Sequence, residues 1–426
     1  MAECIDSVKV WSAARRRWAV VIFTILVFPV AVWIGCRMGT MFVQADTESY
    51  LAMAQGKATM LPFAARQLGP LLARVTANEF HLPVESAFFD LGWAYLLFFL
   101  AVTAWLVVRS GAPRWMFFAV GGLMFWGFQF NALVMPDLLY AALLCGLLLL
   151  LRQGWGMAAG LMMFPLMLSR ESTLLALVCF LIAGWRRLRK GEMATAVIAV
   201  GTAMVVVNRL TQAALPNKEH ISPMLYMIAK MPWNFMRNVA GIGVWANVYP
   251  TCAVPKWQMA VHLGPLHAIG TCGFFPDVPP QAIAVGAAMF GLLPVMVWNV
   301  RKETLRTGGR EDLMLRFALL YGTVSFLMAP LLGEAFPRLY GYGWPLFLVA
   351  LPILLARAGA DFTSNWAAAA FLGVHWFLSW SMVWAFPRWL FQVSVVCWIL
   401  GWILLRTTFR AGGGSDGGEG VPAGGG

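Results

Sequence analysis

Two carboxylates, Asp46 and Glu48, lie in a short polar segment that follows the first long apolar stretch of the chain. A carboxylate in such a segment can act as a general base, because it accepts a proton from a hydroxyl within hydrogen-bond reach. Arg66 follows in the same segment, and its planar guanidinium suits a phosphate or carboxylate group. These residues are therefore candidates for acid–base chemistry and anion binding.

Polar residues of the same kinds recur at the ends of later apolar stretches. A charged group at membrane depth is costly, so each one calls for an explanation. The candidate binding residues are Tyr50, Arg66, Asp137, Arg170, Glu171, Glu334, Arg338 and Tyr340. Two further cations, Lys230 and Arg237, stand in a long polar segment that could cover a site as a lid.

The composition excludes a soluble protein. The chain has 426 residues, of which 60% are hydrophobic and 12% charged, whereas soluble domains carry about 25% charged residues. The net charge of +12 could indicate nucleic acid, but in a membrane protein basic residues first report topology. We therefore expect an all-α, polytopic transmembrane bundle that binds no nucleic acid.

Runs of mostly apolar residues predict twelve membrane spans, since a span needs about 20 such residues. The predicted spans are Trp18–Cys36, Leu91–Val108, Trp115–Val134, Leu138–Leu151, Trp155–Ser169, Ser172–Trp185, Ala194–Asn208, Gln281–Val300, Phe317–Leu332, Leu339–Ala356, Trp366–Phe386 and Trp389–Leu405. The fourth to sixth are short, which allows tilting or a partly re-entrant course.

The basic residues give these spans an orientation. Most of the 31 Lys and Arg residues fall in alternate loops if both termini are cytoplasmic, as the positive-inside rule requires. Residues 1–17 and the Gly-rich tail 406–426 are then cytoplasmic, and the tail is expected to be disordered. The candidate site residues all fall on the opposite, outer face, and this one-sidedness favours a single site.

The remaining segments divide the chain into a core and an outer cover. Residues 18–208 form the predicted transmembrane core with a first outer loop at 37–87, and 281–405 form the C-terminal helices. The segment 209–280 mixes aromatic residues with prolines and predicts an interfacial lid of short helices or loops. Cys252 and Cys272 lie in this lid, where an oxidising compartment would permit a disulfide.

Each candidate has a simpler structural explanation. Asp46 and Asp137 both stand where helices are expected to begin, so either could be an N-cap. Arg170, Arg338 and Arg388 could snorkel from span ends to lipid headgroups. Glu171 is adjacent to Arg170, and neighbours on a helix point about 100° apart, so these two are not expected to pair with each other.

Several short motifs in the outer segments resemble those of the GT-C superfamily, the multi-span glycosyltransferases that use polyprenyl-phosphate-linked sugars. The motifs are DTESYLAMAQG at 46–56, PFAARQLGPLLA at 62–73, PDLLY at 136–140, SRES at 169–172 and RLYGYGWP at 338–345. Many members have two adjacent acids in the first outer loop, whereas Thr47 separates Asp46 from Glu48 here. Either carboxylate is therefore a candidate, and the case for a divalent metal is weakened without being excluded.

The resemblance implies a bacterial inner-membrane enzyme that moves a sugar from a lipid-linked donor to a lipid or glycan acceptor. Asp46 would serve as the general base in an inverting displacement, with no cofactor. Arg66, Arg170 and Arg338 would hold the phosphate, and Asp137 and Glu171 would orient these arginines. Partners would be the donor, the acceptor and membrane lipids.

Two other classes remain open at the level of sequence. A transporter or flippase for a lipid-linked or anionic solute would also have about twelve spans and binding-site arginines. A non-catalytic partner of an envelope assembly complex would not require these charged residues to lie close together. Charges gathered around one outer cavity favour the enzyme, charges along a midplane pathway favour the transporter, and scattered charges favour the partner.

Overall fold

The computed structural model describes most of the N-terminal half of the chain and parts of the C-terminal half. The described residues are 13–37, 46–60, 63–109, 136–213, 223–246, 257–263, 266–280, 310–333 and 339–357, with the single positions Ala282, Gly286, Val393, Val396 and Leu400.

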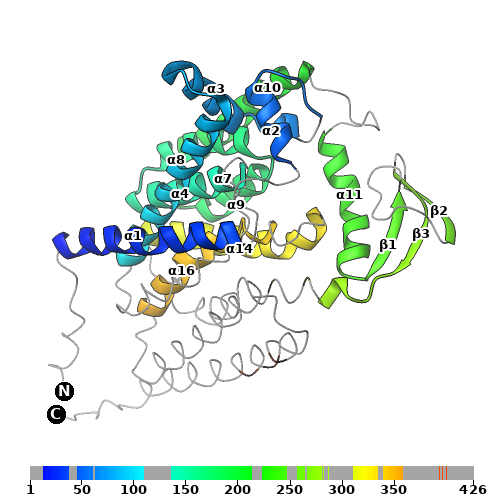
Figure 1. Cartoon of the computed structure of the whole chain (residues 1–426). Helices are drawn as coiled ribbons and strands as arrows, with labels where there is room; N and C mark the ends of the chain where they lie inside the picture. The colour runs from blue at the N-terminus through cyan, green and yellow to red at the C-terminus, as the bar shows by residue number, and fades with distance from the viewer. Residues whose placement is uncertain are drawn as a thin grey trace, which may run out of the picture.

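Most of the described residues are helical, and long helices lie across one another in a bundle (Figure 1). The helices of the bundle are α1 (Ala13–Arg37), α4 (Val84–Val108), α7 (Pro136–Gln153), α8 (Gly156–Ser169), α9 (Thr173–Gly184), α10 (Lys190–Leu210), α14 (Arg310–Leu332) and α16 (Trp344–Arg357). Among the described residues, α1, α4, α7, α10 and α14 are long and apolar enough to cross a membrane, while α8 and α9 are shorter apolar helices. These features indicate a membrane protein.

Eight predicted spans coincide with these helices. The spans that begin at Trp115, Gln281, Trp366 and Trp389 lie wholly or almost wholly outside the described residues. The count of twelve spans and the placement of both termini therefore stay predictions, as does the disorder of the tail.

Small residues allow α8 and α10 to approach closely. A Cβ on Gly160 would lie 2.9 Å from the backbone oxygen of Glu192, and one on Gly156 would collide with the Glu192 carboxylate. Ala196 and Ala203 on the facing side of α10 are fully buried. Small residues four apart are a common way for membrane helices to pack. This contact holds α8, whose far end carries Arg170.

The two ends of the bundle carry different residues. At one end, Arg187, which follows α9, lies 3.7 Å from Asp312 at the start of α14. The opposite ends of α8 and α7 bring Arg170 to Asp137. The chain direction of the described helices is thus consistent with the predicted sides.

The first outer loop folds into short helices against the bundle. They are α2 (Thr47–Ala54), the 3-10 helix η2 (Phe63–Ala65) and α3 (Leu68–Phe80). Arg74 of α3 donates from Nε to the Ala54 oxygen at 2.9 Å and from Nη2 to the Met53 oxygen at 2.5 Å. The Ala54 oxygen lies at the end of α2, where a carbonyl has no partner within the helix, whereas the Met53 oxygen also accepts the Gly56 N–H at 3.0 Å. The two Arg74 bonds fix α2, which carries Tyr50, to α3.

The second outer segment contains a β-sheet, which corrects the expectation of an all-α protein with a lid of short helices or loops. The 3-10 helix η3 (Thr211–Ala213) and α11 (Pro223–Asn238) precede strands β1 (Ile242–Ala246), β2 (Trp257–Leu263) and β3 (Leu266–Phe274). The strands pair antiparallel in the order β1-β3-β2. In Figure 1 the sheet lies beyond α11, to one side of the bundle.

Helix α11 is attached to the end of α14 by two asparagines. The Asn238 side-chain amide donates to the backbone oxygens of Pro330 and Gly333 at 2.7 and 2.9 Å, and Asn234 donates to the Leu331 oxygen at 3.2 Å. The last carbonyls of a helix have no partner within it, so these amides satisfy them. The second segment is therefore held at the C-terminal end of α14, which is the predicted outer end of the bundle.

Candidate functional site

The turn between α8 and α9 places Arg170 and Glu171 at the end of the bundle that the basic residues predict to be outer. Arg170 follows the last residue of α8 and leaves the helix with an extended backbone, φ −162° and ψ 140°. Because the chain reverses here, the two neighbouring side chains reach different partners. Arg170 and Glu171 do not pair with each other, as the sequence predicted: each forms an ion pair with a residue far away in the chain.

Glu171 pairs with Arg66 from the first outer loop. Arg66 donates from Nε to Glu171 Oε2 at 3.0 Å and from Nη2 to Oε1 at 2.5 Å, a bidentate arrangement. Its Nη1 donates to the hydroxyl of Tyr50, one of the fully buried side chains, at 2.8 Å. Three nitrogens of Arg66 are thus engaged with the protein, which fixes the guanidinium in place.

The charges of this pair set its protonation states. Burial opposes ionisation of Glu171, but the positive charge and hydrogen bonds of Arg66 outweigh that effect and hold the pKa of the carboxyl well below its ordinary value. Burial raises the pKa of Tyr50, although the nearby Arg66 and Arg170 lower it in part. Glu171 is therefore ionised and Tyr50 neutral near neutral pH.

Arg170 forms the second ion pair, with Asp137 at the start of α7. Its Nη1 donates to Asp137 Oδ1 at 2.5 Å, and the same oxygen accepts the Tyr342 hydroxyl at 2.6 Å. The guanidinium lies over the Tyr342 ring, 4.3 Å from its centroid, which adds a cation–π contact. Arg170 is 4% exposed and Asp137 5%. A buried ion pair of this kind needs such additional contacts to offset desolvation.

Two more tyrosines extend the network into the bundle. The Tyr140 ring meets the Tyr342 ring edge to face, with centroids 5.7 Å apart. The hydroxyls of Tyr140 and Tyr321 lie 2.7 Å apart, within α7 and α14 respectively. We call the eight residues Tyr50, Arg66, Asp137, Tyr140, Arg170, Glu171, Tyr321 and Tyr342 the outer network.

The outer network leaves donor capacity on one arginine. Its two arginines and two carboxylates balance in charge, so the network itself is neutral. Among the described residues, Arg170 donates hydrogen bonds through Nη1 alone, whereas Arg66 uses Nε, Nη1 and Nη2. The Nε and Nη2 groups of Arg170 thus have no hydrogen bond to another described residue, while Arg66 holds Glu171 and Tyr50.

The two carboxylates of the first outer loop occupy unlike positions. Asp46 stands at the N-cap of α2 in helical geometry, φ −88° and ψ −7°, and is half-buried; Glu48 is exposed. Residues four apart lie about 40° apart around a helix and residues two apart about 200°. Asp46 therefore lies one turn from Tyr50 on the face that meets Arg66, and Glu48 lies on the far face. The geometry favours Asp46 over Glu48 as the base.

The simpler explanations of three candidates do not match their contacts. The Asp46 side chain makes no capping hydrogen bond in α2. The Asp137 carboxylate accepts from Arg170 and Tyr342, which lie in other elements. Arg170 is buried and ion-paired, so it does not snorkel to a headgroup.

The other predicted binding residues either fall outside the described residues or make different contacts. Glu334 and Arg338 are outside the described residues, as is Arg388. Tyr340 packs on Phe326 with ring centroids 5.3 Å apart, and its hydroxyl donates to the Ala282 oxygen at 3.5 Å. The predicted binding role thus fits Tyr342, two residues later in the same motif, better than Tyr340.

The lid residues and cysteines are only partly described. Lys230 and Arg237 both lie in α11, and Arg237 is half-buried in its last turn. Cys272 lies in β3, but Cys252 is outside the described residues, so their pairing stays a prediction. Within the described ranges, no three carboxylate, histidine or cysteine side chains gather closely enough to bind a metal ion.

Sequence reasoning assigned no role to Tyr140, Tyr321 or Tyr342, although Tyr140 and Tyr342 stand in the motifs at 136–140 and 338–345. The chain has only 8 tyrosines, and a buried tyrosine hydroxyl normally needs a hydrogen-bond partner. Tyr140 and Tyr321 stand within apolar spans, where a lone hydroxyl is costly. That cost was the signal that could have identified them.

Comparisons of the chain with protein-family models, with curated proteins and with solved structures gave no match.

Proposed function

We propose that the chain is a membrane glycosyltransferase that moves a sugar from a polyprenyl-phosphate donor to an acceptor hydroxyl at the outer face. One observation carries the proposal: a buried, charge-balanced network gathers from separate segments at one end of the bundle, and Asp46 lies one helical turn from its Tyr50. The motifs that resemble the GT-C superfamily contribute residues to this network. The outer face is the predicted side of these helix ends.

The reaction needs a base, a leaving-group site and an apolar surface. Asp46 accepts the proton of the acceptor hydroxyl as its oxygen bonds to the anomeric carbon. The bond from that carbon to the donor phosphate oxygen breaks, and the phosphate leaves with the electron pair. In-line attack of this kind inverts the anomeric carbon. The membrane bundle supplies the apolar surroundings in which a polyprenyl chain stays dissolved.

The arginines have separate roles in this proposal. Arg170 directs its remaining N–H groups to the departing phosphate and stabilises the charge that develops there. Arg66 is a positioning residue, because its bidentate pair with Glu171 and its bond to Tyr50 fix α2 and therefore Asp46. Asp137 and Tyr342 hold the Arg170 guanidinium in one orientation. Lys230 and Arg237 are proposed to cover the donor from α11.

The position of the charges favours an enzyme over a transporter. Asp137 is the second residue of α7, Arg170 and Glu171 lie between two helices, and Tyr342 precedes α16. These are helix ends, whereas transporters bind their substrates near the membrane midplane. The gathering of residues into one network also opposes a non-catalytic partner, in which no cluster is required.

The function can be tested in a strain that lacks the gene. The strain is complemented with wild type, Asp46→Asn or Glu48→Gln, and its lipids and surface glycans are analysed by mass spectrometry. We expect a sugar to be lost from an envelope lipid or glycan, with the lipid-linked donor accumulating, and Glu48→Gln but not Asp46→Asn to restore it. Glycans that are unchanged in the deletion strain, or restored by Asp46→Asn at equal protein abundance, would refute the proposal.

A further inference from the structure

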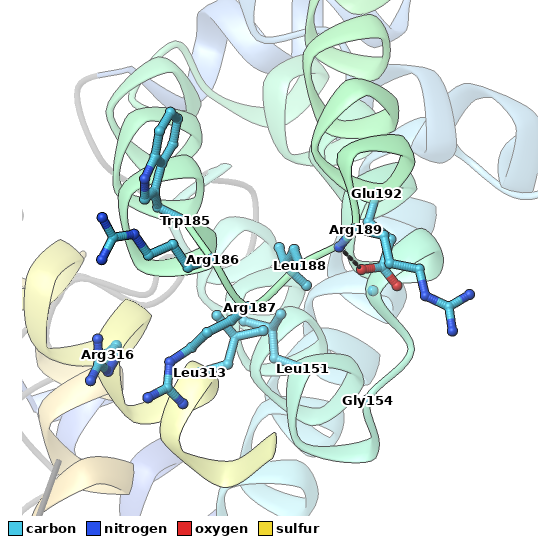
Figure 2. A pocket seen from close by; sticks show the side chains of 11 residues that line it. Leu151, Gly154, Trp185, Arg186, Arg187, Leu188, Arg189, Glu192, Leu313 and Arg316 are labelled. Carbon is cyan, nitrogen blue, oxygen red and sulfur yellow. Dashed lines mark hydrogen bonds between the residues drawn. The ribbon is translucent and has the colours of Figure 1, made fainter. Parts of the chain in front are cut away.

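A cavity of about 810 Å³ lies at the end of the bundle opposite the outer network. It is lined by the loop after α9, by the start of α8 and by the first turns of α14 (Figure 2). Helix α9 separates the two regions, and its 12 residues correspond to about 18 Å. This end carries the loops that the basic residues predict to be cytoplasmic.

Basic side chains dominate the lining of this cavity. In Figure 2, Arg186, Arg187 and Arg316 extend to one side, whereas the guanidinium of Arg189 extends to the other. The acidic lining residue Glu192 is turned toward the start of α10, where it accepts the backbone N–H of Arg189 at 2.8 Å. Buried Asp312 lies 3.7 Å from Arg187. Positive charge remains in excess, so the cavity suits an anion.

The loop backbone supports this arrangement. Arg186 adopts φ 69°, a left-handed conformation that glycine adopts freely and arginine rarely does. The conformation reverses the chain directly after α9, so that consecutive arginines enter the same cavity lining. Arg186 is exposed, and its guanidinium is accessible to a ligand.

An exposed apolar stripe on α9 leads to these arginines. Val178, Ile182 and Trp185 are 51%, 59% and 68% exposed, and their spacing places them on one face of the helix. In a membrane such a face contacts acyl chains, and a tryptophan at its end is typical of the interface. The stripe ends at the residue before Arg186. A surface suited to an acyl chain therefore adjoins the arginines that would bind a phosphate headgroup.

We propose that this cavity binds the phosphate of an anionic phospholipid headgroup, with one acyl chain against the α9 stripe. Guanidinium groups bind phosphate oxygens well, and basic pockets between helices at the cytoplasmic side of a membrane bind anionic headgroups. A soluble phosphate would use the arginines but not the stripe. The site lies apart from Asp46 and does not depend on the proposed transferase function.

Binding can be measured by native mass spectrometry of the full chain in detergent, titrated with phosphatidylglycerol or with phosphatidylcholine of the same chains. Arg186→Gln is expected to weaken phosphatidylglycerol binding about fivefold. Lys190→Gln removes the same charge four residues away, but Lys190 is exposed and does not line the cavity, so we expect binding within about twofold of wild type. Retention of helical circular dichroism shows that both variants fold.

Three results would overturn the proposal. Phosphatidylcholine that binds as tightly as phosphatidylglycerol would remove the charge preference. Equal losses in Arg186→Gln and Lys190→Gln would indicate a general effect of net charge. Glycerol phosphate that binds as tightly as phosphatidylglycerol would identify a site for soluble phosphates, because the acyl chain would then contribute nothing.

Discussion

Replacement of both partners of the Arg66–Glu171 pair should destabilise the fold no more than replacement of one partner. We consider Arg66→Met, Glu171→Met and the double variant. Arg66 joins the first outer loop to the α8–α9 turn through a bidentate ion pair. Each single change leaves the other charged group in a site built for a pair, whereas the double change leaves two apolar side chains.

The expected magnitude follows from the burial of the two side chains. Removing one partner of a buried pair costs about 3–5 kcal/mol. The Arg66 side chain is 6% exposed and that of Glu171 22%, so Glu171 retains some access to water. We therefore expect each single variant to lose about 3 kcal/mol and the double variant also about 3 rather than 6, a coupling of about 3 kcal/mol. The hydrogen bond from Arg66 to Tyr50 does not contribute to this coupling, because it is absent both in Arg66→Met and in the double variant.

Unfolding in mixed micelles titrated with sodium dodecyl sulfate, followed by circular dichroism, gives the four free energies. The coupling is the difference between the double variant and the sum of the single ones. A double variant that loses the sum of the single losses to within about 0.5 kcal/mol would refute the ion pair as the element that joins these segments.

Three further predictions concern the same outer region. Tyr342→Phe should reduce the free energy of unfolding by about 2 kcal/mol, because the hydroxyl donates to a carboxylate; Tyr340→Phe, whose hydroxyl makes a long bond to a neutral carbonyl, is the control and should lose less. Asn238→Ala should speed amide hydrogen exchange in α11, since Asn238 binds two carbonyls at the end of α14, and unchanged exchange would contradict that attachment. Since the folded-state pKa of Glu171 is depressed, its contribution to stability is present above the unfolded pKa of about 4.3 and is lost as the pH falls through the folded value. Wild type should therefore lose more stability than Glu171→Gln between pH 7 and pH 3, and equal losses would contradict the assignment.

The membrane helices could be predicted because each depends on local hydropathy. The apolar runs that begin at Trp18, Leu91 and Ala194 coincide with α1, α4 and α10, since a long apolar run has few alternatives to a membrane helix. The gathering of charged residues also had a local signal. A charge near a span end is costly unless it finds a partner, so Arg170 and Asp137 were expected to have a role.

The pairing within the network could not be predicted from sequence. Arg66 is 105 residues from Glu171 in the chain, and Tyr342 is 205 residues from Asp137. Which acid each arginine meets depends on how the first outer loop and α16 dock on the α8–α9 turn. Tyr340 and Tyr342 share a motif, and only the packing distinguishes them.

The outer sheet had a weak local signal. Strand β3 has the sequence LHAIGTCGF, in which two glycines lower the propensity for extended structure. Strand β3 lies between β1 and β2 and forms backbone hydrogen bonds along both of its edges, which compensates for this low propensity. Pairing between distant segments therefore decides this element, and the prolines around it favoured the interpretation as loops.

The central claim is that Asp46 is the general base of a sugar transfer. The most direct measurement is the rate at which the purified full chain transfers labelled sugar from a panel of polyprenyl-phosphate hexoses and pentoses, in the presence of envelope lipids and glycans as acceptors. We predict that Asp46→Asn lowers this rate about 100-fold or more, whereas Glu48→Gln, on the far face of α2, stays near wild type. Wild-type rates from folded Asp46→Asn, or no transfer by wild type from any donor of the panel, would contradict the claim.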